Sequence, residues 1–150
     1  MMIYLATDHA GFALKEKVKK YLQDLGYGVE DFGAYRLDPD DDYPDFISKA
    51  AEAVSKDPQN RAVILGGSGQ GEAMVANKFP NVRAVVYYGG MDVIPLTREH
   101  NNANILSLGA RFLTEDEAIE AVKLWLETPF TEEERHIRRI EKIKKIEELL

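Results

Sequence analysis

The chain has 150 residues, the usual length of one domain, and we expect a single domain over residues 1–150. It contains no cysteine, which excludes disulfides, iron–sulfur clusters, thiolate metal sites and a catalytic cysteine. Its 26 acidic and 19 basic residues give a net charge of −7, which argues against nucleic acid as a partner.

The N-terminal segment lacks the basic and long apolar regions of a signal peptide. No stretch of the chain reaches the ~18 apolar residues that a membrane span needs. The absence of cysteine is compatible with a reducing compartment. We therefore expect a cytoplasmic protein with no membrane partner.

Short apolar runs rich in β-branched and aromatic residues alternate with amphipathic stretches, which indicates alternating strands and helices. Gly26 follows the first amphipathic stretch as a helix C-cap, and Thr114 with Glu117 forms a capping box at a later one. Because parallel neighbours need crossover connections, five strands separated by helices predict an α/β fold with a parallel sheet covered on both faces. The pattern predicts strands at 3–6, 27–32, 62–65, 83–87 and 105–108, and helices at 12–25, 43–55, 69–77, 91–99 and 114–127.

An acidic segment interrupts this alternation between residues 37 and 45. It carries five aspartates, two prolines and no basic residue. A solvated loop is one interpretation and a divalent-cation site is the other. The segment lacks the glycine and terminal glutamate spacing of a calcium loop, so we expect no bound metal.

The C-terminal segment, residues 131–150, predicts a helix that begins at a capping box of Thr131 and Glu134. Its apolar residues recur at every third position, so at about 100° per residue the apolar stripe shifts by about −60° at each step and winds around the helix. A winding stripe indicates contact with more than one surface, and we expect the helix to cross onto a second subunit. The alternative is a tail packed wholly on its own domain. The stripe consists of Ile137, Ile140, Ile143, Ile146 and Leu149.

Candidate site residues come from the loops at the strand ends, because ligands of an open parallel sheet bind outside the carboxyl ends of its strands. Asp8 and His9 follow the first strand, and Arg111 follows the fifth. His100 and Asn101 lie in the loop before the fifth strand, and we assign them to the same site. The alternatives are a turn cap and a surface imidazole for the first pair, and an exposed helix-end histidine for His100.

A glycine-rich loop, Gly66-Gly67-Ser68-Gly69-Gln70-Gly71, follows the third strand and leads to Glu72. Its four glycines let the backbone approach a ligand closely, and the next helix points free N–H groups at any anion held there. The run is neither a P-loop nor a dinucleotide fingerprint, and a tight turn is the alternative. Glu72 is either a base or an acid stabilised at a helix start; the helix dipole would lower its pKa and an apolar pocket would raise it.

Two arginines of the C-terminal helix are candidates for binding phosphate. Arg135 and Arg139 are four residues apart, about 40° around the helix, so their guanidinium groups can converge on one dianion. Arg138 projects about 100° from Arg139 and is better placed to pair with Glu134. Surface ion pairing of all three is the alternative, because acidic residues 132–134 lie nearby.

Together these motifs resemble the ribose-5-phosphate isomerase B family, which includes galactose-6-phosphate and allose-6-phosphate isomerases. The resemblance covers nearly the whole chain. It implies a Rossmann-like three-layer α/β/α sandwich with a five-stranded parallel sheet, acting as a homodimer whose sites contain residues of both subunits. The motifs are residues 8–15, Asp42-Tyr43-Pro44, the glycine loop through residue 78, residues 83–84, 98–104 and 135–140.

The resemblance also implies the interconversion of ribose 5-phosphate and ribulose 5-phosphate, without metal or organic cofactor. Some family members place a cysteine base just after the third strand, and others a glutamate at the end of the glycine loop. Ser68 matches the cysteine and Glu72 the glutamate, so the lack of cysteine leaves Glu72 as the implied base. Glu72 would move a proton between adjacent carbons through a cis-enediolate, after Asp8 and His100 have assisted ring opening, with His100 as proton donor.

The remaining roles follow from the same resemblance. Asn101 would orient the sugar hydroxyls, and Arg111 would reach the phosphate from the partner subunit. The Ser68 hydroxyl and backbone N–H groups would hold the developing oxyanion. The implied oxyanion donors are Gly67, Ser68, Gly69, Gln70 and Gly71. The implied phosphate ligands are His9, Arg135 and Arg139, joined by Arg111.

Two alternatives stay open. One is an isomerase of another sugar phosphate, namely allose 6-phosphate, galactose 6-phosphate or a tetrose phosphate. The other is a non-catalytic sugar-phosphate-binding module. The presence of Asp8, Ser68, Glu72 and His100 together speaks against the module, because binding alone needs no positioned base. Residues 87–92 have no assigned role.

Overall fold

The computed structural model describes residues 1–150 and contains one five-stranded sheet with the strand order β2-β1-β3-β5-β4. All four neighbouring pairs are parallel, so the predicted α/β class is confirmed. Each strand lies within one residue of its predicted bounds, because the buried strands are short, nearly continuous apolar runs. The strands are β1 Met2–Thr7, β2 Gly28–Asp31, β3 Arg61–Gly66, β4 Ala84–Tyr87 and β5 Ile105–Gly109.

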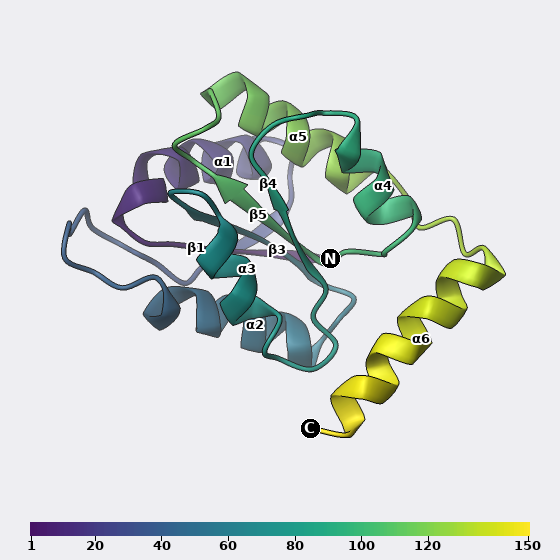
Figure 1. Cartoon of the computed structure of the whole chain (residues 1–150). Helices are drawn as coiled ribbons and strands as arrows, with labels where there is room; N and C mark the ends of the chain where they lie inside the picture. The colour runs from purple at the N-terminus through teal and green to yellow at the C-terminus, as the bar shows by residue number, and fades with distance from the viewer.

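Helices cover both faces of the sheet and complete a Rossmann-like sandwich (Figure 1). On one face, Val18 and Leu22 are buried one helical turn apart and pack in the same core as Trp125. On the other face, Ile47 and Val54 belong to a second core. The first face carries α1 Phe12–Asp24, α4 Val93–Glu99 and α5 Glu115–Glu127; the second carries α2 Pro44–Lys56 and α3 Gln70–Ala76.

The strand order places a crevice between β1 and β3. The chain continues from β1 to β2 on one side, whereas β3 begins the other half of the sheet, so the loops after β1 and β3 diverge at the carboxyl edge. A short 3₁₀ helix, His9–Gly11, follows β1 and lies against β3. A Cβ at Gly11 would collide with Thr7 Oγ1 and Leu65 Cβ, so only glycine permits this approach.

A buried ion pair attaches α1 to the end of β2. The Lys15 side chain is fully buried, and its Nζ lies 2.8 Å from both carboxylate oxygens of Asp31. The same Nζ donates to the carbonyl oxygen of Ala34 at 2.6 Å. Since every donor of this ammonium faces an acceptor or the neighbouring rings of Phe12 and Tyr35, the pair is compensated in the interior.

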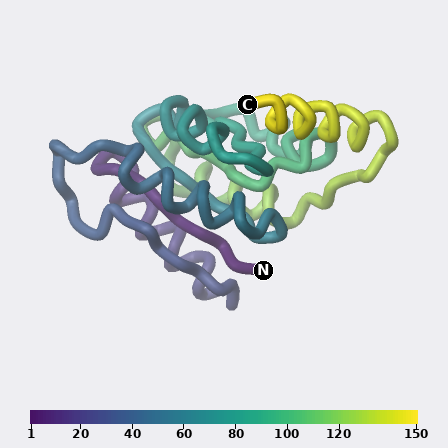
Figure 2. Tube along the Cα trace, turned by 90° about the horizontal axis from the view of Figure 1, so that it is seen from below, coloured from purple at the N-terminus to yellow at the C-terminus, as the bar shows by residue number.

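The last helix, α6 Glu134–Glu148, lies outside the two layers that cover the sheet (Figure 1), and in the view of Figure 2 it runs alongside the edge of the domain. Glu147 near its end accepts from the Asn81 N–H at 3.1 Å. His136 is its only buried residue, while Ile137, Ile143 and Ile146 are exposed. A tail packed wholly on its own domain is therefore not what the structure contains. No helix of the chain is long and apolar enough to cross a membrane.

The predicted capping box of α6 is wrong. Glu133 is the N-cap residue and makes no side-chain cap hydrogen bond. The Thr131 hydroxyl instead donates to the carbonyl oxygen of Glu99 at 2.9 Å. This contact attaches the start of the tail to the end of α4. By contrast, Thr114 caps α5 as predicted, by accepting from the Glu117 N–H at 3.1 Å.

Candidate functional site

A pocket of about 330 Å³ opens at the carboxyl edge of the sheet, where the loops after β1, β3 and β5 meet the loop before α2. It brings together most of the site residues expected from the sequence. Tyr43 and Ala10 join them. The lining residues are Asp8, His9, Ala10, Tyr43, Gly67, Ser68, Gly71, Glu72 and Arg111.

The glycine loop lets charged side chains lie directly on the backbone. A Cβ at Gly66 would collide with the carboxylate of Glu72, and one at Gly67 would lie 3.1 Å from Arg111 Nη1. Gly69 has a φ of +78°, a conformation that favours glycine. The loop is thus more than a tight turn, because its lack of side chains makes room for a carboxylate and a guanidinium group.

The loop is also held in place by the neighbouring strand. Ser107 Oγ of β5 donates to the Gly69 carbonyl oxygen at 2.7 Å, and Ser68 Oγ accepts from the Gln70 N–H at 3.3 Å. Gly69 and Gln70 therefore shape the loop, although they do not line the pocket. A fixed loop keeps its free N–H groups oriented before a ligand arrives.

Glu72 is the more deeply buried of the two acids that line this pocket. Only 4% of the residue is exposed. Burial raises the pKa of its carboxyl above the ordinary value, and the negative charge of Asp8 adds to the rise, while a backbone hydrogen bond opposes it. The sequence left open whether the helix dipole lowers the pKa of Glu72 or an apolar pocket raises it. The structure shows that burial has the larger effect. A carboxylate with a raised pKa is a stronger base.

Asp8 and His9 directly follow β1 and line the pocket together with the glycine loop. One oxygen of Asp8 accepts from the Ala10 N–H at 2.9 Å, so this residue is both a turn cap and a pocket residue. His9 Nδ1 lies 2.8 Å from Asp41 Oδ1. This hydrogen bond raises the pKa of His9 most, burial opposes it, and the charge of Asp8 assists.

Arg111 lies in the pocket of its own chain, so the expectation that a partner subunit supplies it is wrong. It follows β5, whose last residue, Gly109, pairs with Gly66 at the end of β3. The Arg111 N–H donates to the Gly67 carbonyl oxygen at 3.0 Å. The guanidinium group therefore lies over Gly67 of the glycine loop and lines the same pocket as His9.

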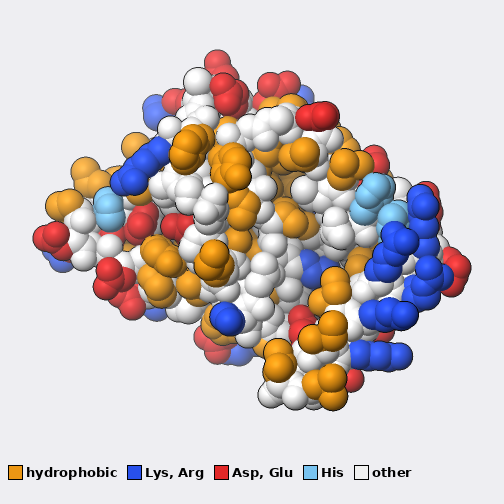
Figure 3. All heavy atoms as spheres, viewed as in Figure 1, with side chains coloured by type: hydrophobic (Ala, Val, Ile, Leu, Met, Phe, Trp, Pro, Cys, Tyr) orange, Lys and Arg blue, Asp and Glu red, His pale blue; other side chains and the backbone are white.

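The other expected site residues lie at the opposite edge of the sheet. His100 and Asn101 precede β5, so they lie beyond Ile105, whereas the pocket lies beyond Gly109. The strand between these ends spans about 13 Å. Our assignment of these residues to the same edge is therefore wrong within one chain. Figure 3 shows histidine side chains in two groups at opposite ends of the molecule.

His100 and His136 form the centre of this second group. Their rings are stacked, with centroids 4.4 Å apart. The pKa of His136 is lowered by burial and by the charges of His100, Arg135 and Arg139. The two arginines of α6 thus lie near the histidine pair, and Arg135 Nε is 3.3 Å from Glu133. The four-residue spacing of Arg135 and Arg139 predicts that they lie on one side of the helix. It does not predict at which edge of the sheet they lie.

Arg138 pairs with Glu134 at 3.2 Å, as predicted. This contact occupies an exposed side of α6 and separates Arg138 from the other two arginines.

Arg98 is a buried residue that the sequence analysis missed as a support for the His100 loop. Its Nη1 donates to the Ala103 carbonyl oxygen at 2.6 Å and to Asn102 Oδ1 at 2.9 Å, and its Nε donates to the Thr128 carbonyl oxygen. Burial lowers the pKa of Arg98 to about 10. Arg98 lies between Thr97 and Glu99 at the end of α4, and this polar setting gives no sequence signal of burial or of this role.

Tyr43 and Asp41 are the pocket-side residues that we did not assign from the sequence. A Cβ at Gly71 would meet the Tyr43 hydroxyl, so the tyrosine lies directly against the glycine loop. Asp41 belongs to the acidic segment, for which a solvated loop was one interpretation. The Asp-Tyr-Pro motif and the acidic run were the available signals.

Asp8, His9 and Asp41 are the only acidic or histidine side chains grouped closely enough to hold a metal ion, with ligand atoms within 4.8 Å of one another. The imidazole nitrogen of this group already faces Asp41 at 2.8 Å. We therefore assign the group as an ion pair with a neighbouring cap residue.

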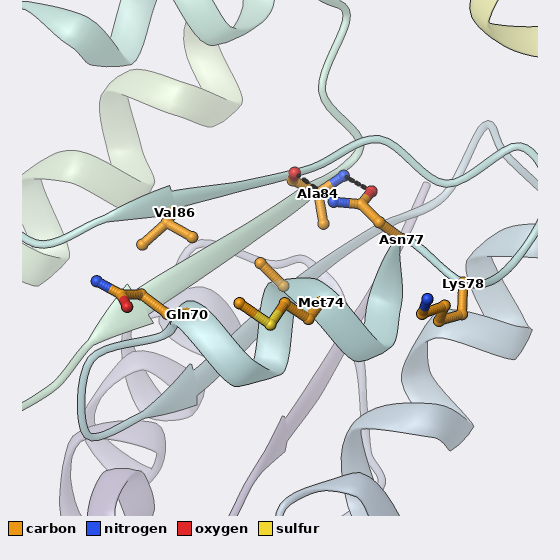
Figure 4. A pocket seen from close by; sticks show the side chains of 7 residues that line it. Gln70, Met74, Asn77, Lys78, Ala84 and Val86 are labelled. Atoms are coloured by element: carbon orange, nitrogen blue, oxygen red, sulfur yellow. Dashed lines mark hydrogen bonds between the residues drawn. The ribbon is translucent and has the colours of Figure 1, made fainter.

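A larger groove of about 520 Å³ lies between α3 and the edge strand β4 (Figure 4). Met74 and Gln70 of α3 extend beside Val86 of the strand, and Met74 is strongly exposed. Asn77 joins the two elements through hydrogen bonds to both the N–H and the carbonyl oxygen of Ala84. The groove is mainly apolar, although Gln70, Asn77 and Lys78 also line it, and it lies outside the pocket that holds Glu72.

The chain is similar to known sugar-phosphate isomerases. A family model described as Ribose/Galactose Isomerase matches residues 3–143. Ribose-5-phosphate isomerase B of Mycobacterium tuberculosis strain H37Rv is 41% identical over 141 residues, which cover 94% of this chain and 86% of that protein.

Solved structures agree with this similarity. Ribose-5-phosphate isomerase B of Mycoplasma genitalium with bound ribulose-5-phosphate gives a TM-score of 0.94 at 36% identity, covering 98% of this chain and 96% of that one. The Clostridium thermocellum ribose-5-phosphate isomerase B gives a TM-score of 0.93 at 40% identity, covering 99% and 98%.

Proposed function

Because the chain belongs to the ribose/galactose isomerase family, we propose that it interconverts ribose 5-phosphate and ribulose 5-phosphate by general base catalysis. The observation that carries this proposal is the carboxylate of Glu72, buried on the bare backbone of Gly66 at the carboxyl edge of the sheet. An aldose–ketose isomerase needs one base that reaches two adjacent carbons, and a carboxylate fixed in a small pocket provides it.

In this mechanism Glu72 removes the proton from C2 of the open-chain aldose and returns it to C1. Negative charge develops on the carbonyl oxygen in the cis-enediolate, and the hydroxyl proton passes from O2 to O1. The N–H groups of the glycine loop and the Ser68 hydroxyl stabilise the oxyanion. Burial of Glu72 supports the role, since it excludes water from the proton-transfer step.

The phosphate is held by cationic groups at the other end of the substrate. His9 and Arg111 face the same pocket, and the hydrogen bond that His9 donates to Asp41 favours the protonated imidazole. A planar guanidinium group and an imidazolium both donate charge-assisted hydrogen bonds to phosphate oxygens. The net charge of −7 does not prevent phosphate binding, because the cationic groups are gathered in the pocket itself.

The enzyme acts as a homodimer, and each site contains residues of both subunits. One chain carries Glu72 and His100 at opposite edges of its sheet, so only a second copy can bring a ring-opening His100 to Glu72. The partner would also supply Asn101, Arg135 and Arg139. The exposed apolar groove of Figure 4 and the exposed isoleucines of α6 support such an interface.

The substrate is tested by incubating the protein with ribose 5-phosphate, allose 6-phosphate and a tetrose phosphate in deuterated water. We expect ketose formation and deuterium exchange at C2 to be fastest with ribose 5-phosphate. Faster turnover of a six- or four-carbon substrate would change the substrate assignment. Binding with neither ketose formation nor exchange for every sugar would contradict catalysis itself. The proposed cellular setting is cytoplasmic pentose phosphate metabolism.

A further inference from the structure

His9 is held by a carboxylate from a distant part of the chain. Asp41 Oδ1 accepts from the His9 backbone N–H at 3.0 Å and lies 2.8 Å from the imidazole Nδ1. One oxygen thus fixes both the backbone and the ring of His9. The residues are 32 positions apart, His9 in the 3₁₀ helix after β1 and Asp41 in the segment before α2, so this contact is formed by the fold and is not a local turn.

Asp41 differs from the other aspartates of its segment. Its side chain is only 9% exposed, whereas Asp40, Asp42 and Asp45 are exposed. Its second oxygen, Oδ2, is buried and has no hydrogen-bond partner in the protein. A buried carboxylate with one free oxygen costs stability, so its negative charge has to be compensated by a cation, and His9 is its closest one.

We infer that Asp41 is a positioning residue, which keeps Nδ1 of His9 protonated and leaves the Nε2–H free to donate to the substrate phosphate. This inference rests on the proposed role of His9 in phosphate binding. With Nδ1 engaged by Asp41, the imidazolium can donate to an anion only through Nε2. The acidic segment therefore acts on the site through His9.

The charges around His9 act in opposite directions. Asp41 and Asp8 favour the imidazolium, whereas burial and the positive charge of Arg111 oppose it. Tyr43 and Glu72 line the same pocket. Without the charge of Asp41, His9 would lie beside Arg111 with only Asp8 to favour its protonation. The positive charge of His9 beside Arg111 therefore depends on the carboxylate of Asp41, which contacts the other side of the imidazole ring.

The test compares Asp41→Asn with Asp40→Asn. Asparagine keeps an oxygen that accepts from the His9 N–H but removes the negative charge. We expect Asp41→Asn to lower the pKa of His9 in NMR titrations and to raise the KM for ribose 5-phosphate about fivefold at pH 8, with kcat within about twofold of the parent. The rise of KM with pH, caused by loss of the His9 proton, begins at a lower pH in this variant. Asp40→Asn should leave both quantities unchanged.

His9→Gln separates this inference from the proposed function. A raised KM in both His9→Gln and Asp41→Asn supports the inference. A raised KM in His9→Gln alone, with the His9 pKa unchanged in Asp41→Asn, overturns the role of Asp41 and leaves phosphate binding by His9 intact. An unchanged KM in His9→Gln overturns both the role of Asp41 and phosphate binding by His9. The proposed isomerase function is judged separately, by the activity of the parent protein. Asp41→Glu retains the charge, so it should keep the His9 pKa higher than Asp41→Asn does if the variant's defect is electrostatic.

Discussion

At the scale of single residues, Glu72 and Gly66 form one functional unit. The carboxylate lies where the first carbon of any larger side chain at Gly66 would be. The glycine therefore provides the space that lets the base be buried, and burial is the first cause of its raised pKa. In the sequence alone, the same two residues leave a catalytic base and an acid at a helix start as open alternatives.

Replacing Glu72 by Gln removes the base and keeps the size of the side chain. We expect kcat to fall by at least ~100-fold, as for the loss of a general base. In the parent, kcat/KM should fall as the pH decreases through the pKa of Glu72, because only the carboxylate accepts the proton, and this fall begins at a higher pH than for an ordinary glutamate. Steady-state kinetics across pH measure both. Near-normal turnover of Glu72→Gln would contradict the assignment, with the exposed Glu115→Gln as control.

Gly66→Ala tests the space occupied by the base. The added methyl group collides with the flexible end of Glu72, so the carboxylate moves while the backbone remains allowed. We expect kcat to fall at least about tenfold with only a small change in the free energy of unfolding. Gly28→Ala, whose Cβ would make an ordinary contact with Met2, serves as control. Equal kcat in both variants would show that Glu72 is not confined by Gly66.

At the scale of elements, the strands and helices were predictable because their apolar periodicity is local. The failure of Thr131 to cap α6 was not predictable, because its hydroxyl donates instead to the carbonyl oxygen of Glu99 in a tertiary contact. The edge on which His100 lies could have been deduced from chain direction, because residues that precede a parallel strand lie at its amino end. The His9–Asp41 contact depends on the path of a 32-residue connection, which no local pattern specifies.

The Lys15–Asp31 pair predicts an acid-sensitive attachment of α1 to β2. Burial tends to raise the pKa of Asp31, but hydrogen bonds from Lys15 and the Gly33 N–H outweigh it and lower that pKa. The stabilisation is therefore present above the ordinary pKa of 3.8 and is lost as the pH falls towards the lowered value.

Lys15→Met should lower the free energy of unfolding by about 3 kcal/mol at pH 7, because it leaves a buried carboxylate without its main partner. Urea unfolding at pH 7 and pH 3 measures this difference, which should shrink at the lower pH. Lys20→Met, in the exposed pair with Asp24, should change stability little. Equal effects of the two substitutions would contradict the buried-pair account.

Helix α6 offers a matched pair of arginines for testing phosphate binding. Arg139→Ala should raise the KM for ribose 5-phosphate about tenfold with a smaller effect on kcat, because the loss removes a charge-assisted contact. Arg138→Ala should leave KM unchanged, since Arg138 pairs with Glu134. Steady-state kinetics of both variants make the comparison. An unchanged KM in Arg139→Ala would return that residue to surface ion pairing.

At the scale of the whole molecule, the sequence and the comparisons agree on family and fold, and the family resemblance is confirmed. The lack of cysteine distinguishes two kinds of catalytic base only once that family is known. What the sequence pattern could not supply is the separation of the site residues into two groups at opposite edges of one sheet. The proposed homodimer with shared sites would account for that separation, for the exposed groove beside β4 and for the exposed stripe of α6.

Mixing two inactive variants tests this shared site most directly. Glu72→Gln and His100→Ala each remove one half of every site, so each homodimer should be nearly inactive. After the two are unfolded together and refolded at equal amounts, half of the dimers are mixed and each contains one intact site, which predicts recovery of about a quarter of the parent activity. Activity no higher than that of the separate variants would contradict a site built from two subunits.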